Sequence, residues 1–311
     1  MLKRLSMLTM AIIVALNLGV AGVSAADNDK EESINEKFGL PILVLGGTLN
    51  DQQKEEVRKM LGVTNPEMVE EVTVTGDDLV RYISGESRNA RMFSSAKITR
   101  EEQGTGLVIN RVNPENITEV TDTMYANALI TAGIEDATVE IASPVKVSGH
   151  SALTGIYKAY EVSGEELDTA RLEVANDELN LATDLAEEEG IEQEKVSELL
   201  ADIKQQIAEN KPASREEVEA IVEEQLNKLN IDLSEEDRKR LTDLFDQMRN
   251  LNINFDNVSE QLGKLSDTIQ DRLGDVVNNE GFWQGVKDFF NGIIDAIAGI
   301  FGSGTEDEST N

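Results

Sequence analysis

The distribution of short apolar runs along the chain constrains its fold more than any other feature. Up to about Gly164, runs typical of β-strands alternate with stretches of helical periodicity, and beyond Gly164 the periodicity is helical almost throughout. Alternation of this kind predicts a mixed or mostly parallel sheet with flanking helices, whereas a series of helices predicts an all-α region. The expected fold class is therefore an α/β domain followed by an all-α region.

The first strands and helices can be assigned from local patterns. Residues 41–45 form a continuous apolar run that ends at Gly46-Gly47, as expected for a strand buried on both faces. The capping pair Asn50 and Gln53 starts a helix, and an alternating run at 72–75 completes a βαβ unit. A short helix is expected at 77–83.

The rest of the α/β region contains three further strands and two helices. The runs at 93–100 and 106–112, separated by a polar loop, are predicted to form a hairpin. Residues 121–132, followed by Gly133, have the periodicity and the stop signal of an amphipathic helix. An alternating strand at 139–141 and a helix at 152–162 follow.

In the second region, Ser214 with Glu217 and Ser234 with Asp237 mark two helix starts, and the apolar spacing through 262–273 indicates a further helix. Most of the acidic residues lie in this region. Charged runs on amphipathic helices usually face water, so we interpret these acids as solvated helix faces.

The amino terminus has the pattern of a secretory signal peptide. Lys3 and Arg4 precede an uncharged apolar run, which ends in the small-residue sequence Val23-Ser24-Ala25 and is followed by acidic residues. The run is too short, and its flank too acidic, for a retained membrane anchor. The chain has no Cys to accept lipid. We therefore expect an unlipidated protein that is secreted, extracellular or located at the cell envelope.

These patterns divide the chain into six segments. The predicted segments are a signal peptide at 1–25, a flexible leader at 26–37, an α/β domain at 38–165, an acidic helical domain at 166–279, an amphipathic terminal helix at 280–301 and an acidic disordered tail at 302–311.

Composition excludes several classes of function. With 60 Asp and Glu against 28 Lys and Arg, the formal net charge is −32, which offers no basic surface for phosphates, so nucleic acid is excluded as a partner. The absence of Cys excludes disulfides, thiolate nucleophiles and cysteine zinc sites, and a single His leaves little room for multi-histidine metal sites. No catalytic, cofactor-binding or metal-ligating residue is assigned.

Three stretches carry a resemblance to a known family. They are residues 121–133 (TDTMYANALITAG), 137–139 (ATV) and 147–161 (VSGHSALTGIYKAYE). The chain resembles the secreted Firmicutes family called domain of unknown function 1002, over nearly all of the mature sequence. This resemblance implies export and an envelope or extracellular setting. It implies no established activity, and no functional residue can be carried over, because none is assigned in that family.

His150 lies where a hydrolase would place its nucleophile, between a predicted strand and a predicted helix. The nucleophile-elbow motif requires Gly two residues after the serine Ser151, and Leu153 stands there instead. His150 adjoins Ser151 and is not expected to fold back as its general base. We therefore interpret the segment as a strand-to-helix turn in which Ser148 or Ser151 caps the following helix.

No cofactor or dedicated metal site is indicated. Gly46-Gly47 lacks the phosphate-loop and dinucleotide motifs, so a tight turn is expected. The nearest approaches to a calcium loop, 232–237 and 252–256, lack the turn Gly and the final Glu. Weak, diffuse association of divalent cations is compatible with the many acids. Sequence cannot show whether two carboxylates lie at glycosidase spacing.

The terminal helix is predicted to present one dense apolar face. The residues of this stripe recur at spacings of three and four, and the other side is polar. The predicted membrane or partner contacts are Phe282, Trp283, Val286, Phe289, Phe290, Ile293, Ile294, Ile297, Ile300 and Phe301. Three interpretations stay open: docking on the chain's own helical domain, insertion into a membrane interface, and contact with an envelope protein or another partner.

The function expected from these features is non-enzymatic binding or interaction at the cell envelope. The alternative is an extracellular hydrolase that uses carboxylate acid and base residues in the α/β domain, because such residues leave little trace in a sequence. A cleft in that domain with convergent carboxylates of shifted pKa would favour the hydrolase.

Overall fold

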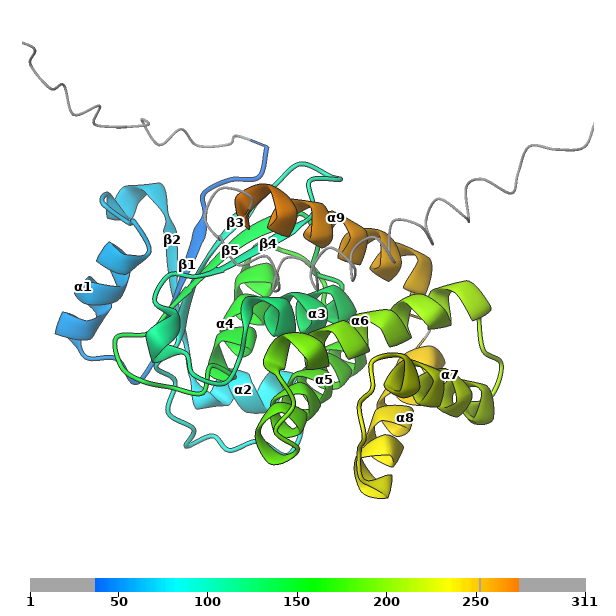
Figure 1. Cartoon of the computed structure of the whole chain (residues 1–311). Coiled ribbons are helices and arrows are strands. Elements are labelled where there is room, and N and C mark those ends of the chain that lie inside the picture. Colours follow the sequence, from blue (N-terminus) through cyan, green and yellow to red (C-terminus); the bar gives the residue numbers. More distant parts are fainter. Residues whose placement is uncertain (1–36, 252, 274–311) are drawn as a thin grey trace, which may run out of the picture. The chain divides into compact units, whose positions relative to one another are not determined.

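The computed structural model describes residues 37–251 and 253–273 (Figure 1). The predicted signal peptide, nearly all of the leader, the terminal helix and the tail lie outside the described residues and stay predictions. No helix within the described ranges is both long enough and apolar enough to cross a bilayer.

A mixed five-stranded sheet forms the first part of the fold, in the order β2-β1-β3-β5-β4 (Figure 1). Strand β1 (Ile42–Gly46) pairs in parallel with β2 (Glu70–Val74) and antiparallel with β3 (Ser95–Arg100). Strand β5 (Ala137–Ala142) pairs antiparallel with β3 and in parallel with β4 (Leu107–Arg111). The predicted fold class is confirmed: a mixed sheet with interleaved helices, followed by a helical region.

The predicted hairpin of the third and fourth strands is wrong, because β5 lies between β3 and β4 and pairs with both. The loop between these strands is attached to the start of β5 through Asp136. One carboxylate oxygen of Asp136 accepts the amides of Gly104 at 3.0 Å and Gly106 at 2.7 Å, and the Asp136 carbonyl accepts the Glu101 amide at 2.8 Å. The loop that was expected to close a hairpin is therefore bonded to a residue some 30 positions further along the chain.

Nine α-helices and two 3-10 turns lie in the described ranges. Beside the sheet are α1 (Asp51–Met60), α2 (Gly76–Tyr82), α3 (Asp122–Ala132) and α4 (Ser151–Val162), with the turns Pro66–Met68 and Pro114–Asn116. The helical region consists of α5 (Thr169–Glu188), α6 (Gln193–Asn210), α7 (Arg215–Lys228), α8 (Glu235–Asn250) and α9 (Phe255–Leu273).

The helix-start signals of the sequence are confirmed. Asn50 and Gln53 form a capping box at α1. The hydroxyls of Ser214 and Ser234 accept the amides of Glu217 and Asp237 at the starts of α7 and α8. Each bond satisfies a donor that a helix leaves unpaired in its first turn, so these starts are fixed by residues adjacent in sequence.

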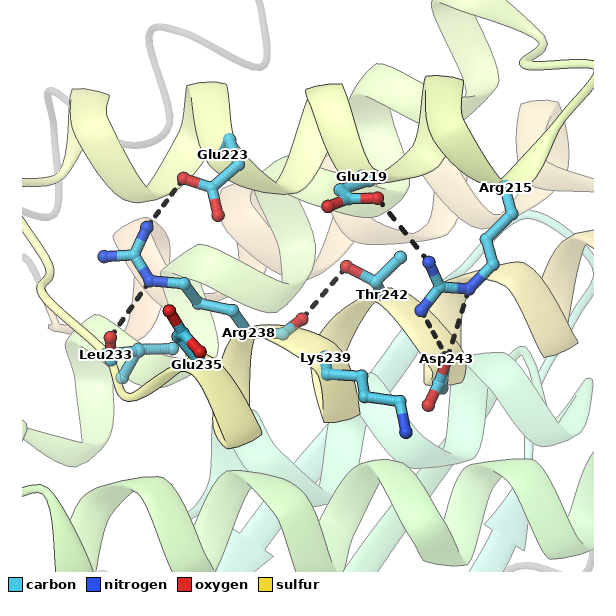
Figure 2. Close-up of a pocket in the computed structure, with 9 residues that line it drawn as sticks. All are labelled: Arg215, Glu219, Glu223, Leu233, Glu235, Arg238, Lys239, Thr242 and Asp243. Carbon is cyan, nitrogen blue, oxygen red and sulfur yellow. Dashed lines mark hydrogen bonds and ion pairs between the residues drawn. The ribbon is translucent and has the colours of Figure 1, made fainter.

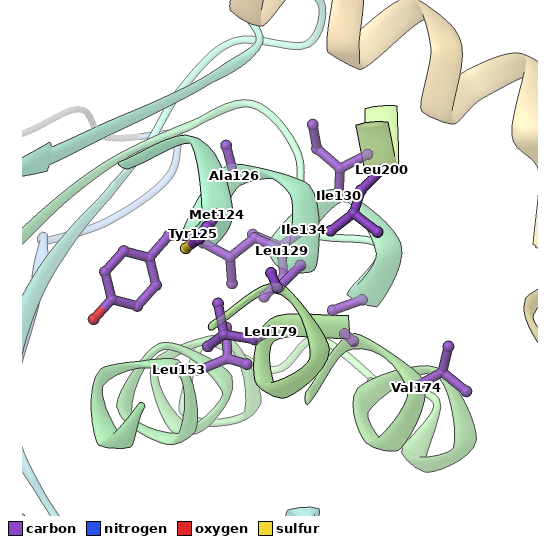
Figure 3. Close-up of a cluster of buried hydrophobic side chains, with 14 of the residues drawn as sticks. Met124, Tyr125, Ala126, Leu129, Ile130, Ile134, Leu153, Val174, Leu179 and Leu200 are labelled. Carbon is purple, nitrogen blue, oxygen red and sulfur yellow. The ribbon is translucent and has the colours of Figure 1, made fainter. Parts of the chain in front are cut away.

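Helix α3 differs from its prediction, because it is buried all round rather than amphipathic. Every residue from Met124 to Ala132 is buried. The helix packs against β4 on one side and against α5 and α6 on the other. Figure 3 shows Leu129 of α3 close to Leu153 of α4 and Leu179 of α5. A helix enclosed by sheet and helices has no face left for water.

The sheet separates two apolar clusters. On one face, Val44 of β1 belongs to the main core, which includes residues of α2 to α9. On the other face, Leu43 and Leu45 pack with Val57 of α1 in a smaller cluster. Strand β1 is therefore buried on both faces, as its apolar run predicted. The main core is continuous from the sheet into the helical region, and the boundary predicted near residue 165 stays a prediction.

Candidate functional site

The turn from β5 to α4 holds His150, and the backbone of Gly149 fixes its position. Gly149 has φ +116°, and a Cβ there would lie 2.6 Å from the hydroxyl of Tyr125 and 2.8 Å from Ile117. The buried Tyr125 hydroxyl donates to the Gly149 carbonyl at 2.6 Å. The close approach requires glycine, and the tyrosine anchors the turn from α3.

Both ring nitrogens of His150 have hydroxyl partners. Nδ1 lies 3.2 Å from Ser148 Oγ, and Nε2 lies 3.1 Å from Thr183 Oγ1 of α5. The Thr183 hydroxyl donates its proton to helix carbonyls, that of Asn180 at 2.9 Å. Nε2 must therefore donate to Thr183, and Nδ1 accepts from Ser148, which assigns the Nε2-protonated neutral tautomer.

Carboxylates surround this histidine. Glu119 Oε2 lies 3.9 Å from Nδ1. Burial lowers the pKa of His150, and the negative charges of Asp184, Glu187 and Glu86 oppose this shift. Burial, and then repulsion by Glu187, raises the pKa of Glu119. The imidazole of His150 is thus neutral and surrounded by acids, and it lies between the turn before α4 and helix α5.

The histidine cluster does not form a nucleophile relay. In a Ser-His-acid relay the nucleophile and the acid bond to opposite ring nitrogens. Here Ser148 and Glu119 both face Nδ1, and Nε2 is occupied by Thr183. The expected serine cap is also wrong: His150 is the N-cap of α4 and makes no side-chain capping bond. The Ser148 hydroxyl bonds to the imidazole instead.

A groove of about 1000 Å³ lies between α7 and α8 (Figure 2). Two ion pairs cross from one helix to the other: Arg238 to Glu223 at 2.7 Å and Arg215 to Asp243 at 2.6 Å. Figure 2 shows these side chains pointing toward one another across the groove. Four of the charged side chains that line the groove therefore hold the two helices together.

A smaller cavity of about 280 Å³ lies where α6 ends and α9 begins, lined among others by Ile207, Lys211, Arg249 and Phe255. Both cavities belong to the helical region, whereas the hydrolase hypothesis called for a cleft in the α/β domain. The acid whose pKa rises to about 7, Glu198, also lies in the helical region, on α6.

The structure buries one ion pair that sequence reasoning missed. Lys204 of α6 and Glu178 of α5 lie 2.5 Å apart, and their side chains are 0% and 1% exposed. The pair is completed by Thr131, whose hydroxyl donates to Glu178 at 2.6 Å, and by the Asn127 carbonyl, which accepts from Lys204 at 2.9 Å. A signal was present: Lys204 follows Leu200 by four residues, on the apolar stripe of its helix.

The described residues of the weak calcium candidates bond to neighbouring side chains or to the first turn of a helix, and Asn252 lies outside the described residues. Asp232 pairs with Arg238 at 2.9 Å, and Asp237 bonds to Ser234 at the start of α8. Asp256 pairs with Lys211 at 3.1 Å, and Asn254 accepts the Asn257 amide at the start of α9. In the described part of the chain, no group of three or more His, Asp or Glu side chains is placed to hold a metal ion.

The predicted contact residues, Phe282 to Phe301, lie outside the described residues. Their role stays a prediction, as do export and the identity of a partner.

Comparison with known proteins agrees with the resemblance seen in the sequence. The model of the family described as "Protein of unknown function (DUF1002)" matches residues 45–265. The uncharacterized protein YpuA of Bacillus subtilis (strain 168) is 37% identical over 266 residues, which cover 84% of this chain and 89% of that protein. No solved structure matches.

Proposed function

The chain belongs to the DUF1002 family, and we propose that it is an exported, non-enzymatic protein that binds at the cell envelope through the apolar stripe of residues 280–301. Export is supported by the signal-peptide pattern at the amino terminus. The family match ends at residue 265, so the stripe lies beyond the part that the family model covers.

One observation carries the proposal: ten large apolar residues recur at spacings of three and four between Phe282 and Phe301. A stripe of this size needs a partner surface. Among the described side chains, Val162 is the large apolar residue that stands exposed, at 40%. The proposal assigns the stripe to an external surface, and docking on the chain's own helical region is the alternative outcome of the experiment below.

Charge determines which kind of membrane contact is compatible with this sequence. Residues 280–301 contain Lys287 against the acids Glu280, Asp288 and Asp295, and further acids follow in the tail. Anionic lipid repels such a segment, whereas interfacial helices are usually rich in Lys and Arg. Binding to lipid would then depend on burial of aromatic and aliphatic side chains, and neutral vesicles are the appropriate probe.

The geometry at His150 argues against one enzymatic role, that of a general base for a serine nucleophile. The two hydroxyl partners occupy both ring nitrogens, so the imidazole has no free position for a substrate proton. The alternative hydrolase that uses carboxylates does not involve this imidazole.

Vesicle sedimentation tests the proposal. The mature chain is mixed with phosphatidylcholine vesicles, and the pelleted fraction is measured for the wild type, for Phe290→Glu on the stripe and for Asn291→Glu on the polar side. We expect the stripe variant to lose most of its pelleting and the matched variant to keep it. If all three stay in the supernatant, the same variants are compared for cross-linking to envelope proteins in cells.

The proposal would be contradicted if Phe290→Glu and the wild type gave the same result in both the sedimentation and the cross-linking assay. Separation of cells into medium, wall and membrane fractions tests export independently. We expect the protein outside the cytoplasm, without residues 1–25, as mass spectrometry of its amino terminus would show.

A further inference from the structure

The outer edge of β2 is open. Strand β2 is the last strand on its side of the sheet, and no strand in the described ranges pairs with its other edge (Figure 1). Glu70, Glu71 and Thr73 are exposed. Such an edge presents unpaired backbone donors and acceptors to any extended chain.

The register shows which backbone groups are available. The Glu70 amide donates to the Pro41 carbonyl at 2.9 Å, and the Val74 carbonyl accepts the Gly47 amide at 2.8 Å. In a parallel pair, alternate residues bond to the neighbouring strand, so Glu70, Val72 and Val74 face β1. The N–H and C=O groups of Glu71 and Thr73 therefore point outward. Two residues supply two donors and two acceptors for an added strand.

The opposite edge of the sheet is protected. The Arg111 amide of β4 donates to Asp122 Oδ1 at 3.1 Å, and the same carboxylate oxygen accepts from Arg111 Nε at 2.8 Å. Helices α3 and α9 also pack against β4. The contrast between the two edges singles out β2 as the place for strand addition.

Charge selects the occupant. Exposed acids lie on β2, at Glu70 and Glu71, and beside its ends, at Glu67 and Asp77, where Asp77 pairs with Arg88 at 3.1 Å. Arg58 is bonded to Glu71, with Nη2 2.8 Å from its carboxylate, and also pairs with Glu55. A second copy would set these acids against its own, which is unfavourable across strands. The chain's acidic leader would be repelled in the same way.

We propose that the outer edge of β2 binds an extended, basic peptide segment of a partner protein by strand addition. Backbone bonds to Glu71 and Thr73 would supply the pairing, and the acids beside them would select for Lys or Arg at alternate positions. This surface is distinct from the terminal stripe. The proposal of peptide binding at β2 and the proposal of envelope binding through residues 280–301 can therefore be tested independently.

Fluorescence anisotropy with two labelled octapeptides tests the proposal. One alternates Lys with Val; the other alternates Lys with Pro and has the same charge without the ability to form a strand. We expect the mature chain to bind the first peptide about tenfold or more tightly than the second. Equal binding of the two would reduce the interaction to general attraction by a chain of net charge −32, and would overturn the proposal.

A matched pair of variants locates the site. Thr73→Pro removes an outward N–H without breaking a bond to β1, and proline is tolerated on edge strands. Thr73→Ala keeps the N–H. We expect Thr73→Pro to weaken binding about tenfold or more, and Thr73→Ala to leave it unchanged. Equal affinities in the two variants would place the peptide elsewhere.

Hydrogen exchange on the wild-type chain tests the backbone pairing without any substitution. We expect the peptide to slow exchange at the Glu71 and Thr73 amides, and unchanged exchange there would refute pairing at this edge. Light scattering tests whether the edge binds a second copy of the chain instead. A wild-type dimer that Thr73→Pro dissociates would assign the edge to self-association and would overturn the proposal of a basic partner peptide. None of these measurements involves residues 280–301.

Discussion

Lys204 Nζ lies 2.5 Å from Glu178 Oε1, with both side chains excluded from water. Burial lowers the pKa of Lys204, and the attraction of Glu178 opposes that shift. The pair joins α5 to α6 and is bonded to Thr131 and Asn127 of α3, so three helices meet at one polar point within an apolar core. Burying two charges costs several kcal/mol each, which the mutual attraction and hydrogen bonds must offset.

Removing one member of this pair should destabilise the fold strongly. Lys204→Met leaves the Glu178 charge buried without its partner, and we expect a loss of about 3–5 kcal/mol in the free energy of unfolding. The double variant Lys204→Met/Glu178→Leu should lie within about 1–2 kcal/mol of the wild type, because no buried charge remains. Chemical denaturation measures all three.

The matched control is a surface pair. Arg88 and Asp77 lie 3.1 Å apart with side chains 75% and 73% exposed, so Arg88→Met should change stability by less than about 1 kcal/mol. A Lys204→Met variant as stable as Arg88→Met would show that the buried pair contributes nothing specific.

Glu198 should make stability fall as pH rises. Burial, and then repulsion by Asp202, raises the pKa of Glu198 to about 7. Between the unfolded value of about 4.3 and this one, the folded state holds the proton more tightly, so stability declines through that window. Glu198→Gln should remove this decline, and at pH 8 it should be more stable than the wild type by about 1 kcal/mol after allowance for partial exposure.

Denaturation of both proteins at pH 5 and pH 8 checks this prediction. The difference between variant and wild type must grow with pH. A constant difference would mean that Glu198 titrates normally in the folded chain.

His150 should titrate below its ordinary pKa. Burial favours the neutral ring, so the unfolded chain gains a proton first as the pH falls through about 6.5. Stability is therefore fully present above about pH 6.5 and declines below it. Because the chain has one His, a single imidazole Hε1 signal in a proton NMR titration reports this pKa. A midpoint above 6.5 would show that the surrounding acids dominate over burial.

Gly149→Ala should disrupt the turn that carries His150. The new Cβ would lie 2.6 Å from the Tyr125 hydroxyl, at a φ of +116°. We expect a loss of at least about 2 kcal/mol. Gly164→Ala is the control, because Gly164 has φ +89° and nothing within 4 Å of a Cβ, so it should cost about 1 kcal/mol from φ alone. Thermal denaturation compares them, and equal losses would contradict the predicted clash.

Much of the candidate site could not be read from the sequence. His150 stood out as the single imidazole between a strand and a helix. Its partner Thr183 lies 33 residues further along, on another helix, and gave no signal. Ser148 or Ser151 was expected to cap α4, but the N-cap is His150, and Ser148 bonds to the imidazole ring instead. The terminal stripe was read from periodicity, and it lies outside the described residues.

The sequence by itself determined the elements and many of their ends, such as the Asn50 capping box and the stop at Gly133. These depend on residues a few positions apart, whose contacts the local backbone fixes. Tertiary structure decided that β5 separates β3 from β4, that the β2 edge stays open, and that Lys204 is buried. Each of those outcomes depends on packing between segments that are distant in the chain. The free energy of this packing comes from removing apolar surface from water, and a local sequence pattern does not show which distant surfaces will meet.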